Sequence, residues 1–519
     1  MLHLKQNTIS KNIFLFGLLL ILVGMPLSKF LMSVGQFVLL GNWLWEGKWN
    51  EKWKVIKTSR VLWFMSGFFL IHLLGLLWTE NLEYAFHDLK IKLPLLWFPL
   101  LFLTTYQVLT KKEIHLLLWL FVLSVIVASV TCFIVWLGFT KHKVIDIRDI
   151  SIFNSHIRFA LMIDFSISFL LYYLFIQNEK MWMIIKIIFV FWLIVFLFIM
   201  QSVTGIVILF LLLFFYALRF VVNKTKLSFK IVVLLSLLAG ITASSIWLQK
   251  VIKQQYYSDK ITPKKVKTIN GNMYFHDADS KETENGNLVW TNISFEELEL
   301  SWNRRSVVKF NDLDAKGNPI SSTLIRYLTS KGFYKDATGV GSLTDEDLKH
   351  IQNGITNYRI TNNSGLTSRI HEFIYEYHSF KNNADPSGHT MLMRLEFWKT
   401  GWQIVKQNWF IGVGTGDVQD AYNFEYQLSH SKLQKVWWKR SHNQFLAITI
   451  TFGVFGCMVF LLYLFVPGYS VKNKHQLFIV FMIISIVSML NEDTLETQAG
   501  VTFFGFFYSF LLFPSKEES

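Results

Sequence analysis

Long apolar runs dominate the pattern of hydrophobic and polar positions along this chain. A helix needs about 20 mostly apolar residues to cross the hydrocarbon core of a bilayer. Twelve runs approach that length, nine before residue 250 and three after residue 440. They lie near residues 13–28, 30–45, 61–78, 93–108, 114–138, 157–177, 183–200, 205–222, 231–249, 442–467, 476–490 and 499–513. The pattern predicts an all-α polytopic membrane protein with about 12 transmembrane helices.

The longest polar stretch separates these two groups of apolar runs. The chain is therefore expected to have three parts: residues 1–249 with transmembrane helices 1–9, residues 250–440 as one large loop, and residues 441–519 with transmembrane helices 10–12. The loop carries 25 Lys+Arg and 21 Asp+Glu, so it is solvated and nearly neutral.

The polar loop has helical signals of its own. Thr344-Asp-Glu-Asp347 precedes an apolar residue with the spacing of a capping box, which starts a helix. Residues 366–380 and 390–408 repeat apolar positions with a helical period. We therefore predict a mainly helical loop subdomain.

Composition removes several classes of protein. Of the 519 residues 52% are hydrophobic and only 17% are charged, against about 25% charged in an ordinary soluble domain. An ordinary soluble enzyme, a disordered chain, a disulfide scaffold and a coiled coil are excluded. The two cysteines, Cys132 and Cys457, lie far apart in apolar runs and are expected to be small buried hydrophobes.

The charge balance predicts how the chain is oriented. The net charge is +14, from 50 Lys+Arg and 36 Asp+Glu. In a soluble protein such an excess of positive charge suggests binding to nucleic acid. Membrane proteins, however, concentrate Lys and Arg in their cytoplasmic segments. With the N-terminus inside, most basic residues of the short connections fall on the cytoplasmic side. We therefore expect cytoplasmic termini, a loop on the outer side and no nucleic-acid partner.

Ionisable groups at a membrane edge are costly, so they are candidates for function. Five such groups fall at the same outer level: Lys92, Arg158, Arg394, Arg440 and His442. Each alone has an ordinary explanation, because Lys and Arg at helix ends extend to the interface. Together they form an arrangement that suits a strongly anionic headgroup next to a general base.

Two acidic residues and a glycine motif need separate interpretation. Glu492 and Asp493 lie between the last two runs, where they are either solvated or orient His442. Gly412-Val-Gly-Thr-Gly416 resembles a phosphate loop, but it lacks the strand–loop–helix context and lies on the outer side. No ligand spacing typical of a zinc site occurs. We expect no metal, no nucleotide and no other cofactor.

Four stretches occur in an order and spacing that resemble one known family. They are Arg394-Leu-Glu-Phe-Trp398, Asn408-Trp-Phe-Ile-Gly-Val-Gly-Thr-Gly-Asp417, Ser441-His-Asn-Gln-Phe-Leu446 and Gly453-Val-Phe-Gly456. In this respect the chain is similar to the O-antigen ligases and O-antigen polymerases, a family that also includes protein O-oligosaccharyltransferases. The resemblance implies a GT-C-like bundle with a large periplasmic loop.

The resemblance also implies roles for individual residues. His442 matches the family's catalytic histidine, and Arg394 matches the arginine of its loop helix. Lys92 and Arg158 match basic residues that bind the diphosphate. This chain departs from the pattern at Gln201-Ser-Val-Thr-Gly205, where many members carry a Ser-Arg-Gly-like sequence. The missing cation would then come from elsewhere, either from Arg440 or from Arg369.

The activity implied is glycan transfer in the periplasm of a bacterial inner membrane. The donor would be a polysaccharide on a polyprenyl diphosphate such as undecaprenyl diphosphate, and the reaction would be metal-independent and inverting. O-antigen ligation to lipid A–core, a step of lipopolysaccharide biosynthesis in the cell envelope, is the favoured acceptor chemistry. An O-antigen polymerase and a protein O-oligosaccharyltransferase are the alternatives within the family.

A membrane transporter or flippase is the alternative from another class. Twelve spans with both ends inside suit such a protein as well. Transport sites, however, usually lie near the membrane midplane between two related halves. Here the charged groups gather at the outer edge, and the second half of the chain does not repeat the first.

Overall fold

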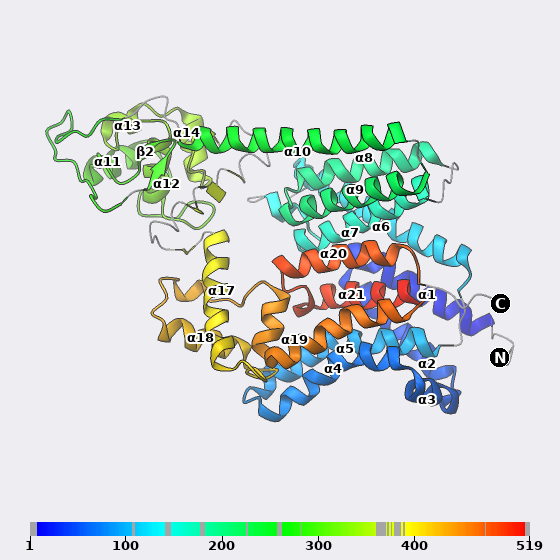
Figure 1. Cartoon of the computed structure of the whole chain (residues 1–519). Helices are drawn as coiled ribbons and strands as arrows, with labels where there is room; N and C mark the ends of the chain where they lie inside the picture. Colours follow the sequence, from blue (N-terminus) through cyan, green and yellow to red (C-terminus); the bar gives the residue numbers. More distant parts are fainter. Residues whose placement is uncertain are drawn as a thin grey trace. The chain divides into compact units, whose positions relative to one another are not determined.

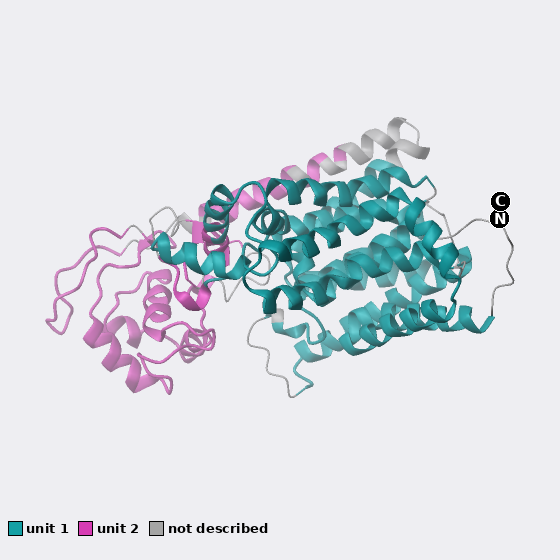
Figure 2. Ribbon diagram, turned by 90° about the horizontal axis from the view of Figure 1, so that it is seen from below, with its two compact units in different colours: residues 1–223, 397–431, 438–519 teal, residues 224–396, 432–437 magenta. Residues whose placement is uncertain are grey.

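The structure is a computed structural model of the 519-residue chain. It describes residues 8–105, 109–140, 147–176, 182–224, 227–256, 262–280, 282–359, 370, 373–374, 376–377, 386–387, 390–472 and 474–513. The chain divides into two compact units, which Figure 2 colours separately. Unit 1 comprises Met1–Asn223, Phe397–Ser431 and Trp438–Ser519, and unit 2 comprises Lys224–Glu396 and Lys432–Trp437.

Unit 1 is a bundle of long helices (Figure 1). Before the polar stretch it contains α1 Thr8–Leu27, α2 Lys29–Trp45, α3 Trp49–Thr58, α4 Arg60–Leu74, α5 Leu82–Thr104, α6 Lys111–Trp136, α7 His156–Leu171, α8 Met183–Ile199 and most of α9 Val203–Lys224. After it come the larger part of α17 Thr390–Gln407, then α18 Val418–Leu428, α19 Gln444–Ser470, α20 Leu477–Asn491 and α21 Gln498–Leu512. Short turns η1 Gly75–Trp78, η2 Ile147–Ile150, η3 Tyr172–Ile176 and η5 Thr494–Glu496 connect some of them.

A helix occupies each of the twelve apolar runs, as the sequence predicts. Within the described part of the chain, five helical segments are long and apolar enough to cross a membrane, by length and composition. They are Thr8–Leu27, Arg60–Trp78, Lys111–Trp136, His156–Phe175 and Gln444–Ser470. For the remaining runs, crossing the membrane stays a prediction.

Polar residues fix where these apolar helices begin. The Asn81 side chain accepts a hydrogen bond from the Tyr84 amide at the start of α5, and Asn443 does the same for Leu446 at the start of α19. Such caps satisfy backbone amides that have no partner within the first turn of a helix. Asn81 begins the helix that contains Lys92, and Asn443 directly follows His442, so the caps also fix the backbone of these predicted site residues.

Helix α21 lies in the middle of unit 1 and is buried along almost its whole length. Its Phe507 ring packs 5.1 Å from Phe121 of α6 and 4.5 Å from Phe165 of α7, between ring centroids. Aromatic pairs at this spacing add to the stabilisation from burial alone. The bundle is therefore held by a core of phenylalanine rings, which accounts for their abundance in the sequence.

The glycine motif Gly412-Val-Gly-Thr-Gly416 is a packing seam. A Cβ on Gly412, whose φ is +72°, would lie 2.3 Å from the backbone of Thr451 in α19. The kink of α19 lies at Gly453, and there a Cβ would meet the backbone of Phe410 at 2.2 Å. Amide hydrogen bonds such as Val413 N to Ile450 O, at 3.0 Å, join the two segments. The glycines allow two backbones to touch directly.

Unit 2 contains α10 Leu227–Tyr256, a small antiparallel hairpin of β1 Thr283–Glu284 and β2 Asn287–Leu288, and four short helices. These helices are α11 Phe295–Arg305, α12 Ile320–Ser330, α13 Ala337–Gly341 and α14 Asp345–Gln352, followed by the turn η4 Lys435–Trp437. They enclose a core of fully buried side chains that includes Trp302, Leu324 and Leu328.

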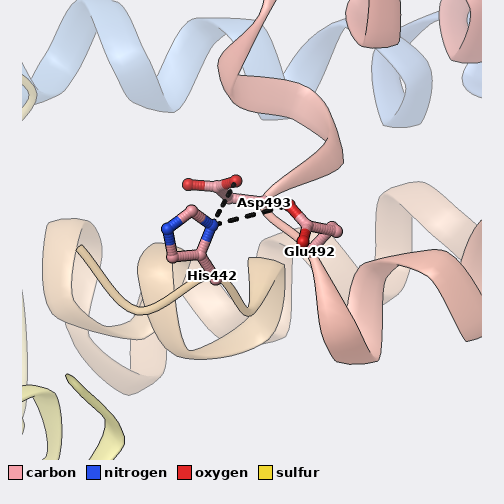
Figure 3. Close-up of side chains that lie close together, drawn as sticks. All are labelled: His442, Glu492 and Asp493. Atoms are coloured by element: carbon pink, nitrogen blue, oxygen red, sulfur yellow. Dashed lines mark ion pairs between the residues drawn. The ribbon is translucent and has the colours of Figure 1, made fainter. Parts of the chain in front are cut away.

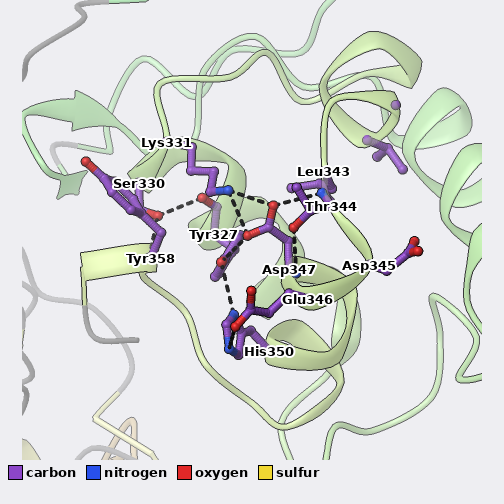
Figure 4. A network of polar contacts seen from close by, with 12 residues as sticks. Tyr327, Ser330, Lys331, Leu343, Thr344, Asp345, Glu346, Asp347, His350 and Tyr358 are labelled. Carbon is purple, nitrogen blue, oxygen red and sulfur yellow. Dashed lines mark hydrogen bonds and ion pairs between the residues drawn. The ribbon is translucent and has the colours of Figure 1, made fainter. Parts of the chain in front are cut away.

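The predicted helix starts in the polar stretch can be compared with this unit. The capping box predicted at Thr344–Asp347 is present and begins α14. Figure 4 shows the polar network around it, in which Asp347 accepts hydrogen bonds from Lys331 and Tyr327. The helix predicted at 390–408 corresponds to α17, whereas most of the predicted helix 366–380, Arg369 included, lies outside the described residues.

Candidate functional site

The predicted outer-edge residues of unit 1 gather at one end of the bundle. Asn491, the last residue of α20, donates a hydrogen bond to Thr204 at the start of α9, at 2.7 Å. Gly205 packs tightly on Ala160, two residues after Arg158 in α7. The start of α19 meets the end of α20 through Asn443, whose amide donates to the Leu490 carbonyl at 2.8 Å. Arg158, His442 and the α20–α21 connection therefore share this end.

The motif Ser441-His-Asn-Gln-Phe-Leu446 presents one histidine from a fixed backbone. His442 has a φ of +47°, a left-handed conformation that non-glycine residues rarely adopt. The Trp398 indole donates to the Ser441 carbonyl at 2.9 Å, and Asn443 caps α19 directly after the histidine. The residues on both sides are thus anchored, and the unusual backbone conformation directs the imidazole toward the α20–α21 connection. Backbone strain of this kind is found at functional sites.

The imidazole faces two carboxylates (Figure 3). Its Nδ1 lies 3.5 Å from Oε2 of Glu492 and 3.7 Å from Oδ1 of Asp493. Nδ1 is buried and has no hydrogen-bond partner among the described residues, while the side chain as a whole is 33% exposed. Both ion pairs drawn in Figure 3 end at Nδ1 and not at the second ring nitrogen. The acids thus contact the imidazole through Nδ1.

The surroundings of Asp493 shift the pKa of its carboxyl group upward. Burial raises this pKa, and the negative charges of Glu496 and Glu492 raise it further, whereas His442 and Arg440 oppose the change. Perturbed acids of this kind cluster at functional sites.

Two of the predicted cations belong to a buried ion-pair cluster. Lys92 of α5 contacts Asp88 at 2.5 Å and Oε2 of Glu496 at 3.0 Å, and only 2% of its side chain is exposed. Arg440 lies 3.5 Å from the same Oε2 and also contacts the Tyr84 hydroxyl. Burial would raise the pKa of Glu496, but Lys92 and Arg440 outweigh it and hold that pKa low.

A small cavity borders this cluster. Lys92, Arg440, Glu496, His72 and Thr415 are among the residues that line it. Its volume of about 10 Å³ is close to the smallest that accepts one water molecule. In this conformation the cluster is therefore closed to a group as large as a diphosphate.

The other two predicted cations have different surroundings. Arg158 donates from Nη1 to the Ser155 hydroxyl at 2.9 Å, and its buried Nε has no partner among the described residues. Arg394 lies on the first part of α17, which belongs to unit 2. Three residues later on the same helix, the Phe397 ring of unit 1 lies 5.8 Å from the His442 ring, between centroids.

Sequence reasoning did not assign roles to Asp88, Tyr84 and Glu496. A signal exists for Asp88, which stands four residues before Lys92 on a helix, a spacing at which ion pairs form. Glu496 follows Asp493 by three residues, but its cationic partners lie elsewhere in the sequence. Only the fold brings them together.

His442, Glu492 and Asp493 also have the composition of a metal site. One ligand atom from each lies within 4.8 Å of the others, and this is the one such group among the described residues. An imidazole nitrogen and two carboxylate oxygens are common ligands for divalent cations. The same geometry suits a histidine oriented by acids, and the expectation of no metal stays a prediction.

The comparisons with known proteins bear on this end of the bundle. The O-antigen ligase family model matches residues 344–461, which include the glycine seam and the motif around His442. No curated protein matches the chain. The match agrees with the resemblance predicted from the four sequence motifs, and residues 344–461 are therefore similar to the O-antigen ligase family.

Proposed function

We propose that the protein transfers a glycan from a polyprenyl diphosphate to an acceptor hydroxyl at the periplasmic face of a bacterial inner membrane. The observation that carries this proposal is the geometry of His442, which lies within the matched segment. Its Nδ1 lies 3.5 Å from Glu492 and 3.7 Å from Asp493, and both ion pairs in Figure 3 end at this nitrogen. A base oriented in this way by acids is suited to deprotonating a hydroxyl group.

In the proposed step the second nitrogen of His442 takes the proton of the acceptor hydroxyl. The acceptor oxygen forms a bond to the anomeric carbon, and the bond from that carbon to the diphosphate oxygen breaks. The diphosphate leaves with the electron pair, so the anomeric centre inverts. Glu492 and Asp493 stabilise the imidazolium that results, as the acid does in a Ser-His-Asp triad. Proton transfer of this kind contributes about 10²–10⁴-fold to a rate.

The diphosphate leaving group gains negative charge during this step. Guanidinium groups bind phosphate oxygens in a two-pronged geometry, so Arg394 and Arg158 are the proposed direct contacts. Lys92 and Arg440 are proposed to add positive potential near the diphosphate. A direct bond from either would require release from Glu496, which already contacts both. Cations fixed in advance near developing charge lower a barrier effectively.

We favour lipid A–core as the acceptor, which makes the protein an O-antigen ligase. A polymerase would use another lipid-linked repeat, and a protein O-oligosaccharyltransferase would use Ser or Thr. Gene deletion separates the three. Loss of a ligase leaves long chains on the lipid carrier, loss of a polymerase leaves core with single repeats, and loss of a protein transferase spares the lipopolysaccharide ladder.

The decisive experiment is a transfer assay with the purified full chain. The donor is a polyprenyl-diphosphate-linked polysaccharide, and lipid A–core, a second lipid-linked repeat and a Ser/Thr peptide are offered in parallel. We expect transfer to lipid A–core, with release of polyprenyl diphosphate, and unchanged rates in EDTA. Rates that fall in EDTA and recover with a divalent cation would reject the metal-independent mechanism.

A transporter or flippase predicts a different result in the same preparation. Proteoliposomes would then move the lipid-linked glycan across the bilayer, and no acceptor would be modified. That outcome would overturn the proposed function.

A further inference from the structure

Two segments that are distant in sequence are joined closely beside His442. The first is Arg440–Gln444, and the second runs from Leu490 at the end of α20 into the α20–α21 connection as far as Glu496. The Leu495 amide donates to Oε1 of Gln444 at 2.7 Å, and Nε2 of Gln444 donates to Oε1 of Glu496 at 3.3 Å. Together with the bond from Asn443 to Leu490, these contacts fix the connection at both ends. Glu492 and Asp493 lie between the fixed points and face the imidazole.

Glu496 is the residue on which these contacts converge. Its Oε2 contacts both Lys92 and Arg440, and its Oε1 accepts a hydrogen bond from the side-chain amide of Gln444. It thereby links α5, the segment before α19, the first turn of α19 and the α20–α21 connection. Among the described residues, Glu496 is the carboxylate that contacts both Lys92 and Arg440.

We propose that Glu496 is a positioning residue for the transfer reaction: it holds the α20–α21 connection against Arg440–Gln444, so that Glu492 and Asp493 stay in register with Nδ1 of His442. This inference rests on the proposed function of His442. It gives Lys92 and Arg440 a part in the reaction that needs no contact with the diphosphate, because they act by holding Glu496.

Three features support a positioning role over a purely local ion pair. The carboxylate is held in its charged form, since Lys92 and Arg440 lower the pKa of Glu496 despite its burial. Both ring-facing acids stand three and four residues before Glu496 on the same short connection. The contacts to His442 are 3.5 and 3.7 Å, and they depend on where that connection lies. A misplacement of about 1 Å in such a site can cost about 10²-fold in rate.

The first test replaces the charge and keeps the shape. Glu496→Gln in the purified full chain should lower kcat by about 10-fold or more, while KM for the lipid-linked donor changes less than about twofold. Glu83→Gln is the matched control, because Glu83 is an exposed glutamate in the first turn of α5. We expect this control to keep both constants. An unchanged kcat in Glu496→Gln, in a preparation where His442→Ala is inactive, would overturn the proposal.

A second test separates positioning from general stability. Glu496→Asp keeps the charge that faces Lys92 and Arg440 but shortens the side chain by one methylene, so the α20–α21 connection loses its exact position. We expect this variant to keep a thermal midpoint closer to that of the parent than Glu496→Gln does, while its kcat stays low. Recovery of both the midpoint and kcat in Glu496→Asp would show that Glu496 serves charge balance alone, and would contradict the proposal.

The failure of this inference is distinguishable from failure of the proposed function. If the parent protein transfers no glycan to any acceptor, the function itself is wrong. If the parent is active and His442→Ala is inactive, but both Glu496 variants retain kcat, only the positioning role is wrong.

Discussion

Asp347 of unit 2 is buried and Asp493 of unit 1 is half-buried, and the two aspartates have opposite environments. Asp347 of unit 2 accepts hydrogen bonds from Lys331 at 2.6 and 2.7 Å, from the Tyr327 hydroxyl at 2.6 Å and from the Thr344 amide at 2.9 Å (Figure 4). These donors outweigh burial and lower the pKa of Asp347 to about 2. Its carboxylate is fully satisfied and caps α14, a role in stability.

Asp493 of unit 1 has the opposite environment. Burial and neighbouring acids raise its pKa, and the imidazole nitrogen 3.7 Å away has no hydrogen-bond partner among the described residues. Native proteins satisfy most buried polar groups, so a polar pair left open requires an explanation. The comparison indicates that unit 2 uses its polar networks for folding, whereas this end of unit 1 keeps polar groups available for chemistry.

The largest effect is expected where the glycine seam is broken. Gly412→Ala would place a Cβ 2.3 Å from the Thr451 backbone at a φ of +72°, so we expect a loss of about 3 kcal/mol or more. Gly317→Ala of unit 2 is the matched control, with a φ of +84° and open space around it. It should cost only about 1 kcal/mol. Thermal unfolding and transfer activity of the two purified variants measure the difference. Equal losses of stability would contradict the role of Gly412 in close backbone packing.

From the comparison of the two aspartates we expect one substitution to lower activity and the other to lower stability. Asp493→Asn should lower kcat by about 10²-fold, because the imidazolium loses its charged partner. Its folding stability should stay constant or rise, since burial disfavours the ionised form of the parent residue. Asp347→Asn should lower the stability of unit 2 by about 2 kcal/mol and leave kcat unchanged. Denaturation curves and kcat for both variants test this; the same phenotype in both would remove the distinction.

A smaller effect is expected for the proposed diphosphate contact on α17. Arg394→Lys keeps the charge and loses the planar two-pronged donor, so transfer should fall about 10-fold to 100-fold. Lys399→Arg on the same helix is the control. It keeps a positive charge and adds the two-pronged guanidinium donor at a different position. An assay across donor concentrations locates the loss in KM or kcat. Full activity in Arg394→Lys would exclude bidentate binding there.

The smallest effect is a dependence of folding on pH. Because the pKa of Asp347 is lowered to about 2, its contribution is present above its ordinary value and is lost as the pH falls from about 4 to about 2. Asp493 has a raised pKa, so its contribution has the opposite sign and is lost as the pH rises through that value. We expect about 2 kcal/mol for Asp347. Hydrogen exchange of the α14 amides across this pH range measures this contribution, with Asp347→Asn as the reference. If the stability of α14 depended on pH with the same slope in both proteins, the prediction would be contradicted.

Much of the fold could be predicted from the sequence because it depends on local pattern. The apolar runs and the capping box at Thr344 depend only on residues that are close in sequence, and the structure has helices there. The sequence leaves two alternatives for Glu492 and Asp493, which are either solvated or orient His442. The structure brings these three side chains together.

The rest of the site depends on contacts between distant segments. Glu496 meets Lys92 across 404 sequence positions, and no periodicity encodes such a pair. The glycine motif shows the same limit, because its sequence suggests a ligand loop while its backbone is packed against α19. Tertiary contact decides in both cases whether a polar or flexible residue serves folding or function.

The central claim is that His442 is the base of a glycan transfer, and one measurement tests it most directly. Purified His442→Ala and parent protein are compared in a single-turnover assay with a polyprenyl-diphosphate-linked polysaccharide and lipid A–core, alongside binding of the donor. The account predicts a rate lower by about 10²–10⁴-fold with donor binding largely retained. Turnover by His442→Ala at the rate of the parent would contradict it.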